Sequence, residues 1–288
     1  MKKPSDSPEP AADARWIAVG ELGEAFGSGA DTHTLAPSPG LAGKRMRLSF
    51  EDGSVADYHF HSATELMRGG GKVEPYRAAQ IRPGILFVDF IASDRRASTI
   101  SLVLDLGRGI CTAIEVELPT EADAKVTPIE RVERGDELTA VTTKFLSGAI
   151  DAPFGHTIDR HTDTHDLIGK RIEYTYSRSE RYEHIYLNER FYTWHCLAGS
   201  EQGLADTDRC RYLRVADRLY LFVWREKIVP TLGAVLVDLE QMKTTGKIFG
   251  YSGFDFGTVM NFPVGARASL VSGERVMISR AAHGGDVF

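Results

Sequence analysis

The sequence has few cysteines, no excess of positive charge and no long apolar run. Its three cysteines, Cys111, Cys196 and Cys210, are an odd number without a CxxC spacing, so we expect free thiols and a cytoplasmic location rather than a disulfide framework. The net charge of −6 argues against a nucleic-acid partner, because neutralising phosphates requires a basic surface. No segment approaches the roughly 20 apolar residues that cross a bilayer, so no membrane partner is expected.

An internal repeat divides the 288 residues into two copies. The run LAGKR at residues 41–45 returns as LIGKR at 167–171, and SLVLDL at 101–106 returns as AVLVDL at 234–239. The offset between the copies grows along the chain, so the second copy carries a net insertion, which falls between residues 192 and 212. We therefore expect two domains of similar fold.

The domain boundaries follow from this repeat. Residues 1–15 start with two lysines near Met1 and continue through an acidic stretch without an apolar core, which is unlike a signal peptide and predicts a disordered segment. We expect the first domain at 16–150 and the second at 151–288. The run 137–144, in the connection between the copies, is expected to supply the last strand of the first domain.

Both copies consist of short runs in which apolar and polar residues alternate. The alternation is clearest at 171–176 and 218–224, and turn residues such as Asp52-Gly53 separate the runs; this pattern predicts β-strands. Outside the strands, short helical turns fit three places, near 20–26, 200–206 and 239–243. Consecutive antiparallel hairpins avoid exposed edges by closing into a barrel, and about eight strands leave room for one small ligand. We predict an all-β chain of two tandem antiparallel meander barrels.

Several long segments resemble the MoaF family. They are LIGKR, YEHIYLNERFYTWHCLAG, GLADTDRCRYLRV, LYLFVWREKIVPTLG and TTGKIFGYSGFDFG. The resemblance extends from about Trp16 to about Gly265. It implies a lipocalin-like, or calycin, barrel in each half.

The second half is more distantly similar to the cofactor-free phenolic acid decarboxylases, which are single lipocalin-like barrels. Gly169 followed by Tyr174-Thr-Tyr176 matches the spacing at the start of that family. Glu226, in Trp224-Arg-Glu226, stands where the family has its catalytic carboxylate in a Trp-Thr-Glu run. The resemblance implies a catalytic set of Tyr174, Tyr176 and Glu226 that needs no cofactor.

One departure from the decarboxylases concerns the ligand charge. Their substrate-orienting arginine, in an Ala-Gly-Arg-Trp run, has no clean counterpart, and the matching stretch 201–209 is acidic apart from Arg209. An acidic stretch suits a cationic or neutral ligand, such as an aromatic amine, better than a carboxylate.

The alternation places the candidate catalytic residues in pairs. Tyr174 and Tyr176 share one face of a strand, as do Trp224 and Glu226. A carboxyl group beside an apolar Trp wall has a raised pKa, which suits general acid/base work. The alternatives are ordinary barrel-lining aromatics and a rim glutamate paired with a neighbouring Lys227 or Arg225. The equivalent positions of the first copy are Leu48, Phe50, Phe90 and Ala92, so any chemistry is expected in the second barrel.

The candidates for ligand contact are polar aromatic and charged residues of the second copy. The histidines among them could instead be hydrogen-bonded interior residues, and the acidic stretch could form a salt-bridged lid. A metal is not expected, because the histidines at 156, 161 and 165 lie in a polar linker at spacings that suit incidental binding at best. The candidates are Tyr182, His184, Tyr192, Trp194, His195, Asp206, Asp208, Arg209 and Trp224.

Three functions fit these patterns. The first is a cofactor-free lyase in which the tyrosines hold a small aromatic molecule and Glu226 moves a proton. The second is a protein that binds or senses an aromatic amine or related metabolite without catalysis. The third is a partner-binding module, in which the first barrel docks another protein or a second copy as a homodimer.

Overall fold

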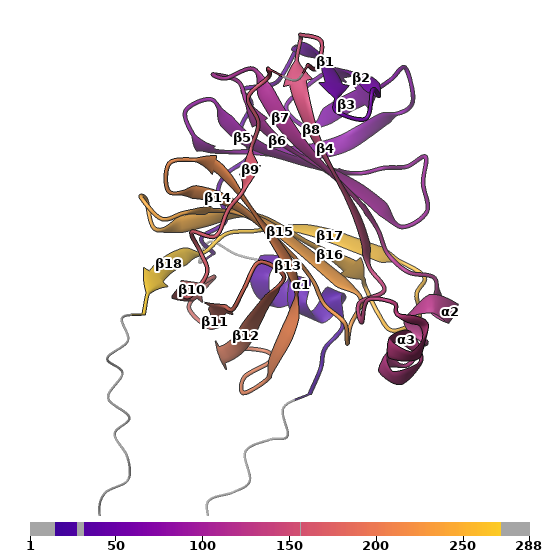
Figure 1. Cartoon of the computed structure of the whole chain (residues 1–288), viewed down its shortest axis with the longest axis vertical. Coiled ribbons are helices and arrows are strands. Elements are labelled where there is room, and N and C mark those ends of the chain that lie inside the picture. Colours follow the sequence, from indigo (N-terminus) through magenta and orange to yellow (C-terminus); the bar gives the residue numbers. More distant parts are fainter. Residues whose placement is uncertain (1–14, 28–31, 156, 272–288) are drawn as a thin grey trace, which may run out of the picture.

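A computed structural model describes residues 15–27, 32–155 and 157–271 of the chain. The predicted disordered segment 1–15 lies almost wholly outside the described residues, as does His156. Within the described part the strands form two closed antiparallel barrels, one above the other in Figure 1. The prediction of an all-β chain with two tandem barrels is therefore confirmed. No helix among the described residues is long and apolar enough to cross a membrane.

The first barrel is a meander of eight strands in chain order. It closes because the last strand pairs with the first, for example Ser49 with Ala149. The eighth strand starts later than the expected run 137–144. The strands are β1 (Arg45–Phe50), β2 (Val55–Phe60), β3 (Glu65–Arg68), β4 (Val73–Arg82), β5 (Ile85–Ile91), β6 (Ser98–Asp105), β7 (Ile110–Glu117) and β8 (Thr142–Ile150).

The second barrel has the same plan with longer strands at the point of the insertion. β12 and β13 form a long hairpin whose pairing closes the ring, and the short strands β9 (Thr162–Asp163) and β17 (Val259–Val264) are added outside it. The ring strands are β10 (Arg171–Thr175), β11 (Arg181–Tyr186), β12 (Phe191–Ala198), β13 (Ala205–Ala216), β14 (Leu219–Arg225), β15 (Thr231–Asp238), β16 (Lys243–Tyr251) and β18 (Arg267–Leu270).

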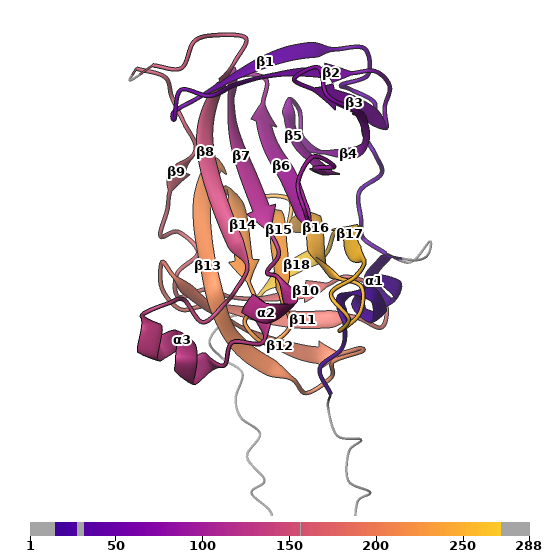
Figure 2. The ribbon, with the colours of Figure 1, turned by 90° about the vertical axis from the view of Figure 1, so that its right-hand side faces the viewer.

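In the described part of the chain, three helices accompany the barrels. The expected helical turn near 20–26 is observed as α1 (Val19–Gly27), which precedes the first barrel in sequence but packs against β16 and β17 of the second (Figure 2). The expectation was wrong at 200–206 and 239–243, which form non-helical turns that lead into β13 and β16. The other two, α2 (Glu121–Ala124) and α3 (Pro128–Arg134), lie in the connection between β7 and β8. Thr127 begins α3 with a capping box, because its hydroxyl accepts from the Glu130 amide while the Glu130 carboxylate accepts from the Thr127 amide.

The two barrels pack through the outer faces of their sheets. Side chains from β4 to β7 and from β13 to β16 form a shared apolar layer between them. The strands β6 and β15 are buried on both faces along their whole length. Fully buried strands read as continuous apolar runs, which explains SLVLDL and AVLVDL in the sequence. The layer fixes the two barrels against each other.

The two interiors differ in chemistry. The first is filled by apolar side chains such as Leu48, Phe60, Phe90 and Leu102, all almost fully buried. The second is filled by tyrosine, tryptophan and histidine side chains that carry polar atoms. Polar groups inside a barrel need hydrogen-bond partners or a ligand. The interior of the second barrel is therefore the better candidate for a functional site.

Candidate functional site in the second barrel

A small cavity lies inside the second barrel, under helix α1. Its volume is about 30 Å³, which is enough for a water molecule. Two apolar side chains of α1 form part of the wall, and strands β11, β12 and β14 supply most of the aromatic rings. The lining residues are Leu22, Phe26, Tyr176, Tyr182, His184, Tyr192, Trp194, Glu201, Trp224, Glu226 and Ile248.

The candidate pair Tyr174 and Tyr176 faces the barrel interior, but only one of the two reaches the cavity. The Tyr174 hydroxyl is 2.6 Å from the Tyr186 hydroxyl, and both side chains are fully buried. Tyr176 lines the cavity. Burial raises the pKa of both tyrosines above the usual value, so both are neutral hydroxyls at physiological pH.

Glu226 follows β14 and turns its carboxyl group toward the cavity. Its Oε1 accepts a hydrogen bond of 3.0 Å from Trp224 Nε1, as the shared face of the two residues predicts. The two neighbouring cations bind elsewhere: Arg225 pairs with Glu137, and Lys227 pairs with Asp206. Burial, and then the negative charges of Asp208 and Glu201, raise the pKa of Glu226 well above its usual value.

Asp208 is not among the lining residues of the cavity, but it lies close enough to Glu226 for its charge to act on that group. Its Oδ2 accepts from Trp194 Nε1 at 3.0 Å and its Oδ1 accepts from the Lys227 backbone at 3.1 Å. Burial raises its pKa to about 6, against the opposing effect of Lys227, whose Nζ is 3.6 Å away. Both tryptophans of β12 and β14 therefore donate to a carboxyl group that resists ionisation.

Glu201 is another carboxyl group that lines the cavity, and the sequence analysis did not single it out. It lies in the turn between β12 and β13, is almost fully buried, and accepts a hydrogen bond of 3.0 Å from the Tyr182 hydroxyl. Burial raises its pKa. Strand alternation could not identify it, because side chains in a turn follow no period of two.

His184 lies among aromatic rings near the centre of the second barrel. Its ring centroid is 4.8 Å from that of Tyr174 and 5.1 Å from that of Tyr192. Burial lowers its pKa to about 3, so the ring is neutral, and its buried Nδ1 has no partner among the described residues. An unpaired buried nitrogen beside a cavity is a point where a bound molecule could donate or accept a hydrogen bond.

Three other candidate ligand residues lie away from the cavity. His195 is on the outer face of β12, 41% exposed, with Nδ1 3.9 Å from a Glu183 carboxylate oxygen. Asp206 forms an ion pair with Lys227 at the rim. Arg209 points outward, where it binds Glu137 at 2.6 Å and lies over the Phe191 ring. The structure thus brings together the aromatic residues and Glu226, but not His195, Asp206 or Arg209.

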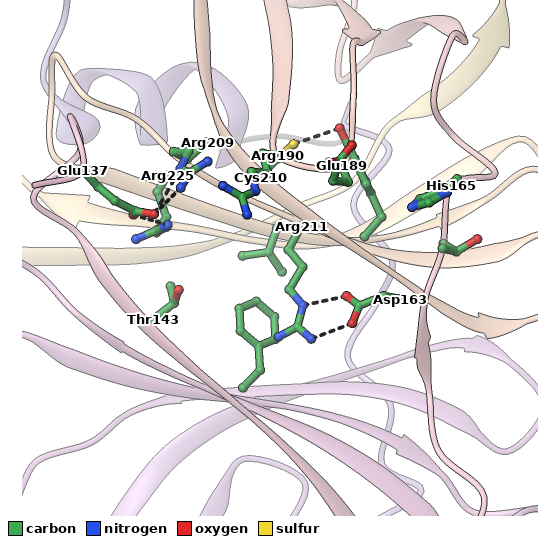
Figure 3. A pocket seen from close by; sticks show the side chains of 14 residues that line it. Glu137, Thr143, Asp163, His165, Glu189, Arg190, Arg209, Cys210, Arg211 and Arg225 are labelled. Atoms are coloured by element: carbon green, nitrogen blue, oxygen red, sulfur yellow. Dashed lines mark hydrogen bonds and ion pairs between the residues drawn. The ribbon is translucent and has the colours of Figure 1, made fainter. Parts of the chain in front are cut away.

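A larger cleft outside the barrel, with a volume of about 500 Å³, lies between β8, β9 and β13 (Figure 3). Several arginines line it, but most are paired with acids. Arg209 and Arg225 share Glu137, and Arg211 makes two hydrogen bonds to Asp163. Glu137 and Asp163 offset part of this positive charge, so the cleft is a weaker candidate for a functional site than the interior of the second barrel.

No group of three or more His, Cys, Asp or Glu side chains is placed to hold a metal ion in the part of the chain that the structure describes. His161 is buried, with Nδ1 2.8 Å from the Thr112 hydroxyl. Burial lowers its pKa to about 4. Cys111, Cys196 and Cys210 are unpaired thiols, as the odd number without a CxxC spacing predicts.

Fold and site together define a protein of two tandem eight-stranded barrels whose second member has an aromatic, carboxyl-lined interior. The chain belongs to the MoaF family: residues 14–120 match the MoaF N-terminal domain and residues 161–274 the MoaF C-terminal domain. It is 44% identical over 260 residues to "Protein MoaF" of Klebsiella aerogenes, covering 90% of this chain and 97% of that protein.

A solved structure gives a more distant comparison. It is described as "Crystal Structure of a putative beta-lactamase from Burkholderia vietnamiensis", with 16% identity and a TM-score of 0.31, covering 36% of this chain and 95% of the other. At that TM-score the likeness supports no conclusion about function.

Proposed function

We propose that the second barrel binds a small aromatic molecule that carries a protonated amine. The observation that supports this most directly is the composition of the cavity wall. Glu226 and Glu201 line it beside the rings of Trp194 and Trp224, and no Lys or Arg is among the lining residues. Aromatic faces and carboxylates attract a cation, whereas an anion would find no positive partner there.

The raised pKa values fit this ligand class. Without a ligand, burial holds Glu226 and Asp208 in their protonated forms more firmly than usual. A bound ammonium group would favour the ionised forms, since an opposite charge nearby stabilises a carboxylate. Binding is therefore expected to release a proton, and affinity should increase as the pH rises.

Access to the site depends on helix α1. The cavity of about 30 Å³ has no room for an aromatic ring. Phe26 fills the adjacent space, with its ring centroid 4.5 Å from Tyr176 and 5.5 Å from Tyr182. In our proposal α1 moves aside and the ligand ring takes the place of Phe26 among the tyrosines.

The test compares three probes of one size: benzylamine, benzyl alcohol and benzoate. The chain has three tryptophans, of which Trp194 and Trp224 line the cavity and Trp16 lies 5.5 Å from Trp194, so tryptophan fluorescence reports on this site. We expect benzylamine to change the emission at lower concentration than benzyl alcohol, and benzoate to have no effect. Glu226→Gln should weaken benzylamine binding by at least about tenfold, whereas the exposed Glu65→Gln should not. A stronger response to benzoate than to benzylamine would refute the proposal.

A second candidate function is a cofactor-free lyase. One observation favours it, namely the environment of Glu226. Its protonated carboxyl group beside Trp224 is suited to give a proton to a substrate carbon. In a decarboxylation the carbon that receives this proton loses carbon dioxide, and Glu226 regains a proton from water. Product formation from phenolic acids, followed by chromatography, is the assay. Turnover that survives Glu226→Gln would exclude this mechanism.

A further inference from the structure

A separate pocket lies between the two barrels, outside both interiors. It has a volume of about 230 Å³ and is lined by β4 and β5 of the first barrel and by β16 and β17 of the second. Most of its wall is apolar, including Phe87, Ile91, Phe262 and Pro263. Pockets with apolar walls and a few fixed polar groups are typical of small-molecule sites.

Lys247 and Asp89, two polar residues of this pocket, form an ion pair with each other. Lys247 is almost fully buried, and its Nζ is 2.7 Å from Asp89 Oδ1 and donates to the Thr99 hydroxyl. Asp89 also accepts from Ser101 at 2.7 Å and from the Asn261 amide nitrogen. The buried lysine and aspartate together are neutral, so they neither attract nor repel a ligand strongly.

Two residues at the same pocket, Arg77 and Asn261, can make further interactions with a ligand. The half-buried Arg77 donates to the Leu35 carbonyl but pairs with no carboxylate among the described residues. Burial lowers the pKa of Arg77, with no acid to oppose the effect. The buried Oδ1 of Asn261 accepts no hydrogen bond from any residue that the structure describes. The amide is not reversed, because its oxygen would then face the Asp89 carboxylate.

We propose that this inter-barrel pocket binds a small apolar carboxylate that also carries a hydroxyl or N–H group. The carboxylate would pair with Arg77, whose planar guanidinium suits two parallel hydrogen bonds to such a group. The hydroxyl or N–H would donate to Asn261 Oδ1, and the hydrocarbon part would lie against Phe87 and Phe262. The volume suits a molecule of about one ring with short substituents.

This site is independent of the one proposed in the second barrel. Its lining contains no tryptophan, whereas two of the three tryptophans line the other cavity and the third packs against one of them. The charges of the two sites are also opposite, since one offers carboxyl groups and the other an unpaired arginine. A ligand of the inter-barrel pocket is therefore an acid, and its binding should leave tryptophan fluorescence unchanged.

The test is calorimetric titration of the full chain with benzoate, 3-hydroxybenzoate, 4-hydroxybenzoate and benzamide. We expect one molar equivalent of benzoate to bind, at least one hydroxybenzoate to bind more tightly, and the neutral benzamide to bind at least about tenfold more weakly. No heat from any of the acids, or equal affinity for benzoate and benzamide, would overturn the proposal. Neither result would bear on the proposed amine site of the second barrel, because binding there is measured by tryptophan fluorescence.

Variants assign the binding to this pocket. Arg77→Gln should weaken benzoate binding at least about tenfold, whereas Arg45→Gln, the same change at an exposed arginine of β1, should not. Asn261→Leu should abolish the advantage of the hydroxybenzoate over benzoate. Ala79→Leu, which fills the pocket without changing its charge, should block binding even if Arg77→Gln folds poorly. Benzoate binding that persists in Ala79→Leu would refute the assignment.

Discussion

The indole ring of Trp224 occupies the space that a side chain at Gly233 would need. The two residues face each other on β14 and β15, and a Cβ atom placed on Gly233 would be 2.0 Å from Trp224 Cζ2. The missing side chain therefore makes room for the ring that donates to Glu226. A glycine inside a strand often marks such a close approach.

Gly233→Ala is expected to displace Trp224 and break its hydrogen bond to Glu226. Overpacking a closed interior costs about 1–3 kcal/mol, so the thermal midpoint should fall and the tryptophan emission should shift. Gly155→Ala is the matched control, because nothing lies within 4 Å of a Cβ at that linker position. If the clash is the cause, adding Trp224→Leu to Gly233→Ala should recover part of the loss; a purely additive double variant would contradict it.

The pH dependence of stability should reflect the buried carboxyl groups. A carboxyl group whose folded pKa is raised holds its proton in the folded state after the unfolded chain has lost it, so the free energy of unfolding falls as the pH rises from the unfolded pKa through the folded one. For Asp208, raised from 3.8 to about 6, the loss is about 3 kcal/mol at most. Glu226 acts in the same direction.

Glu226→Gln removes the loss of stability that comes from ionising Glu226. The glutamine keeps an oxygen that can accept the hydrogen bond from Trp224. The thermal midpoint of the variant should exceed that of the unmodified protein at pH 8, and the difference should shrink as the pH approaches 4. Taking the difference between the two proteins cancels the opposite effect of His161 and His184, whose lowered pKa values reduce stability on acidification. A difference that does not vary with pH would show that the pKa of Glu226 is the same in the folded and the unfolded protein.

The sequence predicts the barrels well because strand alternation and the repeat are local signals. Tyr176, Trp224 and Glu226 were found because they lie on one face of their strands, and the structure places all three at the same cavity. His195 follows the same alternation to the outer face of β12. Chain order, by contrast, gives no reason why α1, at the start of the first half, should cover the second barrel.

Contacts between the barrels were also beyond prediction from the sequence. Lys247 reads as an ordinary polar residue in TTGKIFGY, yet it is buried because β16 packs against the first barrel and Asp89 meets it there. Glu201 was missed for a related reason, since its place at the cavity depends on how a turn folds back. Long-range packing decides both positions, and no local pattern reports it.

Breaking the Lys247–Asp89 pair should destabilise the protein strongly. Removing one partner leaves a buried charge without compensation, which costs about 3–5 kcal/mol. Lys247→Met and Asp89→Asn should each lower the midpoint of urea unfolding, and the double variant should lose less than the sum of the two. Because the pair joins the two barrels, either single variant is expected to split unfolding into two transitions.

An exposed pair provides the comparison. Arg47 and Asp57 are 2.8 Å apart on β1 and β2, with both side chains at least 60% exposed, and such pairs contribute little. Arg47→Met should leave the urea midpoint nearly unchanged. Equal effects at the two pairs would mean that burial between the barrels is not what makes Lys247 important.

Phe26→Ala should separate the stability of the second barrel from its capacity to bind. The ring is buried against Tyr176 and Tyr182, so its loss should cost about 3 kcal/mol. If Phe26 occupies the ligand's place, the same change should tighten benzylamine binding, because less has to move when the ligand enters. Ile129→Ala, on the exposed side of α3, should change neither property. Weaker binding in Phe26→Ala would show instead that Phe26 is part of the wall that holds the ligand, and α1 would then close over a bound molecule rather than give way to it.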